Sequence, residues 1–212
     1  MHGRFCHVVP IDPAKHGPKL WEAYSLDPDA RAWTYLFSGP FESETALTTW
    51  LADAASTADP LFHAIIDPTT GHPVGLAAYL RIDPTMGVIE VGHLRFSSLL
   101  QRRPAATEAM YLMLRRAFDE LGYRRYEWKC DALNAPSREA AERLGFQFEG
   151  IFRQAIVAKG RNRDTAWYSI IDKDWPEIRA RLEHWLRPEN FGPDGIQRDR
   201  LSRSSHYRAT TC

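Results

Sequence analysis

The stretch that decides the fold begins with Val88-Ile-Glu-Val-Gly-His-Leu-Arg-Phe96 and continues through the polar loop Gln101-Arg-Arg-Pro-Ala-Ala-Thr107. The first segment is rich in β-branched and alternating apolar residues, which predicts a strand. The loop leads into a helix at 106–121, whose apolar residues recur at helical spacing. They are Ala109, Leu112, Met113, Ala117 and Leu121. A second alternating segment at 125–130 completes a strand–helix–strand unit.

Two similar turns upstream of this unit predict an antiparallel meander. Asp67-Pro-Thr-Thr-Gly71 and Asp83-Pro-Thr-Met-Gly87 each separate strand-like runs, as hairpin turns do. The strand–helix–strand unit adds one parallel pair, because its crossover brings both strands into the same direction. We therefore expect an α+β fold with a mixed, mostly antiparallel sheet flanked by helices. The other expected elements are helices at 18–25, 41–55, 137–144 and 175–186 and strands at 6–9, 62–66, 74–82, 146–158 and 165–171.

The chain length fits one domain with a sizeable core. It has 212 residues, of which 44% are hydrophobic and 25% charged, as in ordinary globular proteins. We expect a single domain over residues 1–188. The remainder, 189–212, is polar and rich in turn-forming residues, which predicts a flexible tail.

Charge and cysteine patterns exclude several kinds of partner. Lys and Arg together number 27, as do Asp and Glu, so the formal net charge is zero and nucleic-acid binding is not expected. The sequence has no run of 18 apolar residues and no secretory leader pattern, so no membrane association is expected. Cys6, Cys130 and Cys212 are scattered without a C-x-x-C pair. This argues against a metal site and fits reduced thiols in the cytoplasm.

The loop at 101–107 suits an oxyanion. A helix start offers unpaired N–H groups and the positive end of the helix dipole. Pro104 has no N–H but fits the first helical position, and the alanines after it let a phosphate approach the backbone. The N–H groups that remain available are those of Arg103, Ala105, Ala106 and Thr107. The alternative is an ordinary helix start that carries two surface arginines.

Several motifs, in the right order, resemble the GCN5-related N-acetyltransferases (GNATs). Gln101-Arg-Arg-Pro-Ala-Ala106 is similar to their Q/R-x-x-G-x-G/A pyrophosphate loop, with Pro104 in place of a glycine. Asn134-Ala-Pro-Ser137 followed by Glu142-Arg-Leu-Gly-Phe146 resembles a second family segment. Three more stretches resemble the RimJ/RimL branch of ribosomal-protein-serine and -alanine N-acetyltransferases. They are Gly39-Pro-Phe-Glu-Ser-Glu44, Phe148-Glu-Gly-Ile-Phe-Arg-Gln154 and Asp164-Thr-Ala-Trp-Tyr-Ser169.

This resemblance, which covers roughly residues 5–186, implies the GNAT fold: about seven strands with one splayed parallel pair. It implies direct transfer of an acetyl group from acetyl-CoA, the co-substrate, to a primary amine. The acceptor is then a small amine or a protein N-terminus, and the protein is a monomer or homodimer. A catalytically silent module that binds acyl-CoA as a sensor is the alternative. Pro104 favours it, as does alanine at positions 140 and 141, near which many family members carry a tyrosine.

The resemblance also implies which residues bind the cofactor. In the family, the backbone of the strand before the loop carries the pantetheine arm, and the loop itself holds the pyrophosphate. The second family segment contacts pantetheine from the start of the next helix. The expected cofactor-binding residues are Leu94, Arg95, Phe96, Gln101, Arg102, Arg103, Pro104, Ala105, Ala106, Thr107, Asn134 and Ser137.

Three side chains are candidates for proton transfer. His93 titrates near neutral pH and is a candidate general base, with a surface histidine as the alternative. Glu90 is the second candidate base. Strict strand alternation places the two on opposite faces, unless a bulge intervenes. Ser137 is either an N-cap or, as the branch implies, the acid beside the leaving sulfur. Cys130 is expected in the core.

The expected acceptor contacts come from the N-terminal half and the last hairpin. Aromatic residues there are core residues in the alternative interpretation. The tip Lys159-Gly-Arg-Asn-Arg163 either steers an acidic substrate or is a solvated turn. The candidate substrate contacts are Trp33, Tyr35, Trp128, Arg153 and Tyr168.

Overall fold

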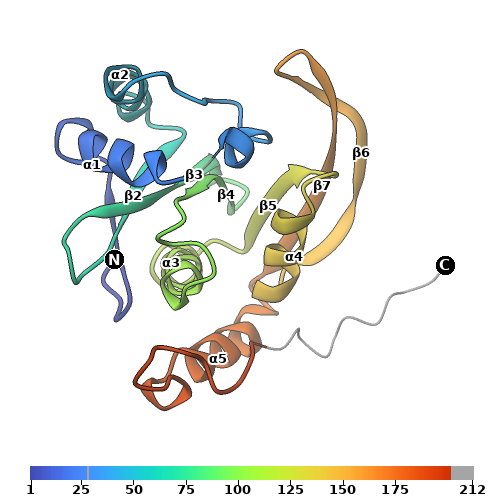
Figure 1. Cartoon of the computed structure of the whole chain (residues 1–212). Helices are drawn as coiled ribbons and strands as arrows, with labels where there is room; N and C mark the ends of the chain where they lie inside the picture. Colours follow the sequence, from blue (N-terminus) through green and yellow to red (C-terminus); the bar gives the residue numbers. More distant parts are fainter. Residues whose placement is uncertain (28, 202–212) are drawn as a thin grey trace.

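A seven-stranded mixed sheet organises the chain (Figure 1), seen here in a computed structural model that describes residues 1–27 and 29–201. The strand order is β1-β2-β3-β4-β5-β7-β6. The strands are β1 (His7–Pro10), β2 (Leu61–Ile66), β3 (Pro73–Asp83), β4 (Val88–Phe96), β5 (Arg125–Asp131), β6 (Gln147–Ala158) and β7 (Arg161–Ile171). All neighbours are antiparallel except β4 and β5. The predicted α+β class, with one parallel pair, is confirmed.

Helices cover both faces of the sheet. They are α1 (Pro13–Ser25), α2 (Glu44–Ala55), α3 (Pro104–Arg115), α4 (Ala135–Leu144) and α5 (Trp175–Trp185), with short turns η1 (Ala30–Trp33), η2 (Arg116–Glu120) and η3 (Pro188–Asn190). Figure 1 shows α1 and α2 on one side of the sheet and α3 and α5 on the other. We call these sides the α1/α2 face and the α3 face. No helix of the described residues is long and apolar enough to cross a bilayer.

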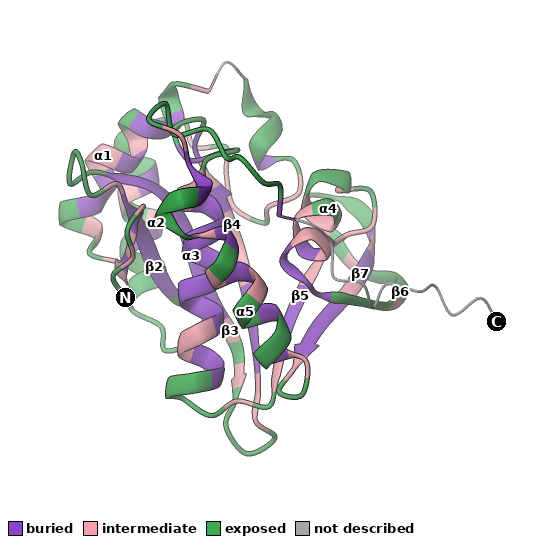
Figure 2. Ribbon diagram, turned by 90° about the horizontal axis from the view of Figure 1, so that it is seen from below, coloured by how far each residue is buried: buried purple, intermediate pink, exposed green. Residues whose placement is uncertain are grey.

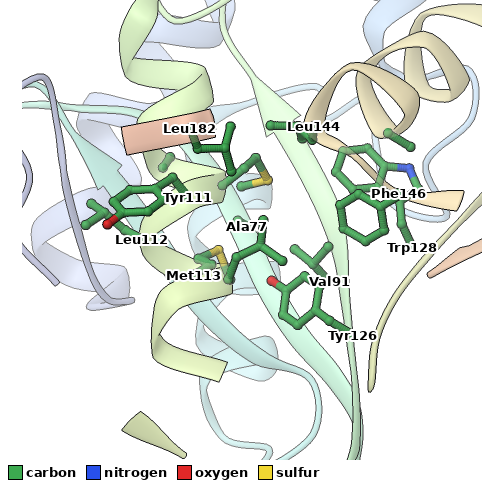
Figure 3. Packing of buried hydrophobic residues seen from close by; sticks show 14 of the residues in the cluster. Ala77, Val91, Tyr111, Leu112, Met113, Tyr126, Trp128, Leu144, Phe146 and Leu182 are labelled. Atoms are coloured by element: carbon green, nitrogen blue, oxygen red, sulfur yellow. The ribbon is translucent and has the colours of Figure 1, made fainter. Parts of the chain in front are cut away.

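The main core lies on the α3 face. Ala77 and Val91 of the central strands pack toward Met113 of α3, while Trp128 and Phe146 lie near Leu144 of α4 (Figure 3). A smaller apolar cluster on the α1/α2 face joins both helices and η1 to Leu76 of β3. The central strands and the inner side of α3 are buried, whereas β6 is largely exposed (Figure 2). The central strands are therefore held from both sides, which gives them fixed positions.

Helix caps fix several boundaries. Ser43 is the N-cap of α2, where its hydroxyl accepts the N–H of Ala46 at 3.1 Å. Asp12 caps α1 in the same way. The helix predicted at 18–25 therefore begins five residues earlier, at Pro13, because a proline in the first turn follows a capping aspartate.

Part of the segment 189–201, within the tail predicted for 189–212, packs on the domain, although residues 193–200 are exposed. Phe191 is 9% exposed, with its ring edge-on to Phe5 and Trp185 at centroid distances of 5.0 and 5.2 Å. Buried Asn190 donates to the carbonyl of Trp185 and accepts the N–H of Asp199, both at 2.8 Å. One buried ring and one satisfied amide thus order a polar segment. The rest of the predicted tail, 202–212, lies outside the described residues.

Replacing Phe191 with alanine should lower the free energy of unfolding by about 3 kcal/mol, because it removes a buried aromatic ring. Urea unfolding followed by tryptophan fluorescence measures the loss. Ile196 is the matched control, because it is apolar, lies in the same segment and is 65% exposed. Ile196→Ala should stay within about 0.5 kcal/mol of the parent. Equal effects of the two substitutions would show that Phe191 is not part of the core.

Candidate functional site

The parallel pair separates partway along its length. The β4/β5 register runs from Val88↔Arg125 to Val91↔Trp128 and ends there. Beyond that point β4 continues beside β3 to Phe96, and β5 continues beside β7 to Asp131. The strand ends at 92–96 and 129–131 therefore diverge, which confirms the predicted splayed pair. Backbone groups on these facing edges have no strand partner.

A bulge in β4 reorients His93. Ala78 pairs with Gly92, but Leu76 pairs with Arg95, so β4 contains one extra residue here. His93 takes the extra position with φ 50°, a left-handed conformation that is uncommon outside glycine. Its ring packs at 4.9 Å from Phe62, which contacts α2. His93 therefore lies on the α1/α2 face.

Glu90 shares that face, so the bulge places both candidate bases on one side of the sheet. A side chain added at Gly92 would meet Leu80 and Glu90, which fixes the direction in which Glu90 points. The bulge removes the expectation of opposite faces, because strand alternation holds only where the register is unbroken.

The imidazole of His93 is half-buried. Neither ring nitrogen has a hydrogen-bond partner among the described residues. Burial lowers the pKa of His93, and the positive charge of Arg81 lowers it further. At neutral pH the ring is therefore in its neutral form, with a nitrogen lone pair available for a proton.

Glu90 is held inside a charged network. The carboxylate is 3% exposed; one oxygen pairs with Arg81 at 2.7 Å and the other lies 2.8 Å from the ammonium of Lys129. That ammonium also pairs with Glu127 at 2.7 Å and lies 3.8 Å from the centre of the Trp167 ring. An acceptor amine cannot reach Glu90 directly, because cations already occupy both of its oxygens.

The side chain of Gln101 closes the loop before α3. Gln101 Nε2 donates to the carbonyl of Phe96 at 2.8 Å, which fastens the loop to the end of β4. Arg102 has φ 59°, and both Arg102 and Arg103 are exposed. Pro104 is the first residue of α3, as predicted. The loop therefore presents two guanidinium groups next to a helix start that has no side-chain cap.

Two of the four N–H groups expected to be available are already used. Arg103 N–H donates to Leu100 at 3.3 Å and Ala106 N–H to Arg103 at 3.1 Å, because the loop closes as tight turns. The N–H of Ala105 has no acceptor among the described residues. Thr107 is buried, and its hydroxyl accepts a hydrogen bond from Arg143 of α4 at 3.0 Å.

Arg143 is a residue that sequence reasoning missed. It lies within Glu142-Arg-Leu-Gly-Phe146, a stretch whose sequence does not show which element the arginine side chain contacts. Its guanidinium reaches from α4 to the first turn of α3, and burial lowers the pKa of that group. A third guanidinium is thus close to the start of α3.

One of the two expectations for Ser137, that it is the N-cap of α4, is wrong. Asn134, not Ser137, is the N-cap, and its side chain accepts the N–H of Ser137 at 3.3 Å. The Ser137 hydroxyl accepts the indole N–H of Trp128 at 3.0 Å. Indole is a donor only, so the hydroxyl oxygen of Ser137 accepts and keeps its own proton to donate; the same side chain also hydrogen-bonds with Cys130. Cys130, beside it, is buried, and burial raises the pKa of its thiol.

Two of the predicted acceptor contacts are core residues of the α3 face. Trp128 is 4% exposed and stacks edge-on against Phe146 (Figure 3), and Tyr168 is fully buried with its hydroxyl accepting from Arg138. Both point away from the face that holds His93, because their positions alternate with Lys129 and Trp167. Their side chains therefore do not line the face that holds His93. Arg153 is exposed on β6, with no contact to the splayed strands among the described residues.

The segment at 33–39 lies over the diverging strand ends. Trp33 is buried against Tyr24 and Phe41, and the hydroxyl of Tyr35 donates to Leu133, just after β5, at 3.2 Å. The guanidinium of Arg95 packs on Tyr24 and Trp33 and pairs with Asp27. Arg95 therefore anchors the N-terminal segment through its side chain, and its backbone carbonyl also accepts the hydroxyl of Tyr24 at 3.1 Å.

Lys159 fixes the hairpin tip to this segment. Its ammonium donates to the carbonyls of Trp33, Ser38 and Gly39 at 2.9, 3.3 and 2.6 Å. Residues 159–162 of the tip are exposed, as in a solvated turn, but Lys159 is not a free cation. No group of three or more His, Cys, Asp or Glu side chains that could hold a metal ion is found within the described part of the chain.

Known proteins resemble this chain along most of its length. A family model described as an acetyltransferase (GNAT) domain matches residues 9–147. A GCN5-related N-acetyltransferase from Brucella melitensis superposes with a TM-score of 0.92 at 48% identity, covering 94% of this chain and 90% of that one. A protein described as a probable GNAT-family acetyltransferase from Chromobacterium violaceum gives 0.78 at 42%, covering 82% and 87%. Bacillus subtilis YnaD, described as an uncharacterized N-acetyltransferase, is 25% identical over 160 residues, which are 74% of this chain and 91% of YnaD.

Proposed function

Because the chain belongs to the GNAT acetyltransferase family, and is thus an acyltransferase, we propose that it moves an acetyl group from acetyl-CoA to a primary amine by direct transfer. The observation that carries the proposal is the separation of β4 from β5 beyond Val91 and Trp128, next to the start of α3. A thioester arm laid between the diverging strands meets unpaired backbone groups there. The acceptor amine then approaches from the α1/α2 face.

The residues at the start of α3 fit a diphosphate. The N–H of Ala105 is unpaired among the described residues, and no side chain caps the helix. Arg102 and Arg103 are exposed beside it, and Arg143 approaches from α4. A helix start with free N–H groups and nearby guanidinium groups binds phosphate oxygens. The backbone of Leu94, Arg95 and Phe96 would hold the pantetheine arm.

The chemistry that acetyl-CoA supplies is an activated thioester; the protein supplies the proton transfers. We assign His93 as the general base, acting directly or through a water molecule, because its ring is neutral and faces the acceptor side. Ser137 holds a proton for the leaving sulfur, because the indole N–H of Trp128 makes the hydroxyl oxygen an acceptor, so the hydroxyl hydrogen is the group that it can donate to a sulfur. Glu90 is proposed to act through its charge near Arg81 and not as a base.

The acceptor is proposed to be a small amine or an exposed protein N-terminus. The branch motifs at 39–44, 148–154 and 164–169 favour the RimJ/RimL type. Free, buried Cys6 and Cys130 fit a reducing cytoplasmic setting. A sensor that binds acyl-CoA without turnover is the second candidate, and Pro104 in the pyrophosphate loop favours it. Thiol release on a panel of primary amines separates the two. Release that depends on both acetyl-CoA and amine supports the enzyme, whereas tight binding with no release on any amine supports the sensor.

Replacing Arg103 with glutamate should raise the Kd for acetyl-CoA about tenfold, because it puts a negative charge beside the diphosphate. Isothermal titration calorimetry measures the affinity. Lys173→Glu is the matched control. Lys173 is exposed and follows β7, at the end of the sheet away from the splayed strands. Its affinity should equal that of the parent. If Arg103→Glu also binds with parental affinity, the phosphates do not lie at the start of α3.

A further inference from the structure

We infer that the amine acceptor carries an oxyanion group, a carboxylate or phosphate, bound by Arg163 and Thr165 on the α1/α2 face. This inference rests on the proposed acetyl transfer and defines the substrate class of the same site. Two side chains that share one face of β7 carry it, because both are buried and neither has its hydrogen bonds satisfied.

Arg163 is a buried cation without a counter-ion. It is 7% exposed, its Nε is fully buried without a partner, and it makes no ion pair or hydrogen bond with any described residue. Its guanidinium lies over the ring of Phe37 at 5.1 Å. Burying an unpaired charge is costly. A cation in this position is therefore best explained by an anion that it meets only when a ligand binds.

Thr165 repeats the pattern two residues along the strand. It is 3% exposed, and its hydroxyl has no partner among the described residues. Residues two apart in a strand point to the same face. Arg163 offers up to five donors in a planar fork and Thr165 one more. Together they match the two or three oxygens of a carboxylate or phosphate better than any neutral group.

The position of this pair fits an acceptor subsite. Thr165 lies opposite Asp131, three residues beyond the last β4/β5 pair at Trp128, which is about 10 Å along the strand. Glu90 and Arg81 are among the charged groups that influence Arg163, and all three side chains belong to the α1/α2 face. An amine beside His93 and an oxyanion on Arg163 are thus ends of one small molecule.

The other charged side chains of this face already have partners, so Arg163 keeps its charge available for an added anion. Lys129 and Arg81 already neutralise Glu90. Asp131 is the nearest other carboxylate along the strands; it influences Arg163 but makes no ion pair with it, and one of its oxygens accepts the N–H of Leu133 at 2.9 Å. Burial lowers the pKa of Arg163, against the opposing effect of Asp131, as expected of a cation that lacks a partner.

Paired probes test the inference on the full-length protein. Free amino acids and dipeptides are compared with their C-terminal carboxamides, and aminoalkylphosphonates of matched length distinguish a phosphate from a carboxylate. We expect kcat/KM at least about 30-fold higher for one class of oxyanion probe than for the carboxamides, as truncation of a buried charged contact suggests. Arg163→Met should abolish this preference through KM, leave kcat on carboxamides and the acetyl-CoA Kd unchanged, and keep or raise Tm. Arg163→Lys should restore part of the preference.

Controls separate this result from folding defects. Arg187→Met changes an exposed arginine that follows α5 and should keep the full preference. Thr165→Val keeps the shape of the side chain and should raise KM for the oxyanion probe several-fold, which provides a second test if Arg163→Met folds poorly. A parent protein that prefers neither the carboxylate nor the phosphonate probes over the carboxamides overturns the inference, as does a preference that survives Arg163→Met.

Failure of acetyl transfer is distinguishable from failure of this inference. If acetyl-CoA does not bind, or no amine is acetylated, the same probes are tested by thermal shift. Stabilisation of the parent but not of Arg163→Met by oxyanion probes supports the subsite even though the proposed reaction fails. In that case, no stabilisation of the parent by any probe overturns the inference as well.

Discussion

Replacing His93 with asparagine is expected to lower kcat by about 10²-fold or more, the usual effect of losing a general base. Asparagine is chosen because His93 has φ 50°, and asparagine tolerates this conformation better than alanine does. The side chain that accepts the amine proton is then lost while the bulge keeps its shape. Thiol release at saturating acetyl-CoA and amine measures the change, and the Kd for acetyl-CoA should stay within about twofold.

Gln154 supplies the matched control. It also has φ 50°, in a bulge of β6, and it is exposed. Gln154→Asn therefore makes the same substitution to asparagine in the same backbone conformation, away from the splayed strands, and should leave kcat unchanged. A His93→Asn variant that turns over at the parental rate would remove His93 from the mechanism.

The pH profile gives an independent test of the same assignment. A base must be unprotonated, so kcat/KM should fall as pH drops through the pKa of His93. Burial and Arg81 both lower that pKa below its usual value of about 6.5. Arg81→Met removes one of these causes, so the acid limb should move to higher pH. An acid limb that does not move, in a variant that folds normally, would indicate another titrating group.

The sequence predicted β4 with its observed bounds, because apolar alternation and two Asp-Pro-x-x-Gly turns are local signals. It could not place Glu90 and His93 on one face. The extra residue at His93 appears only when β4 is paired with β3, and histidine carries no local signal for a positive φ. A register slip of one residue reverses every face assignment beyond it, so the site depends on a tertiary feature.

The cap of α4 was within reach of the sequence. Pro136 favours the first turn of a helix, so the helix had to begin before Ser137, with Asn134 as its cap. The charges of β5 were harder to interpret. Arg125, Glu127 and Lys129 alternate with apolar residues and suggest a solvated face, but the structure buries that face. Only the arrangement of Glu90 opposite Glu127 in the parallel pair explains why Lys129 lies between them.

Replacing Lys129 with methionine is expected to lower the free energy of unfolding by about 3–5 kcal/mol, as breaking a buried ion pair does. Lys129 binds Glu90 and Glu127 at 2.8 and 2.7 Å and is 8% exposed. Without it, two buried carboxylates face each other across adjacent strands. For a domain of this size the loss corresponds to a fall in Tm of about 10 °C, which calorimetry or urea unfolding measures. Lys19→Met, which breaks an exposed pair with Glu22, should change stability by less than about 1 kcal/mol.

The pH dependence of this deficit identifies its cause. Burial opposes ionisation of Glu127, but Lys129 and Arg125 outweigh it and hold the pKa of Glu127 below its usual value. A lowered carboxyl pKa stabilises the fold above the unfolded-state value of about 4.3, and that contribution is lost as pH falls through the folded-state pKa. The deficit of Lys129→Met should therefore be largest near neutral pH and shrink in acid. Adding Glu90→Gln and Glu127→Gln to this variant should recover most of the loss, because the two like charges that face each other between the strands are then removed. A deficit that is unchanged by acid and by these substitutions would mean that Lys129 stabilises the fold by packing on Trp167 and not by its charge.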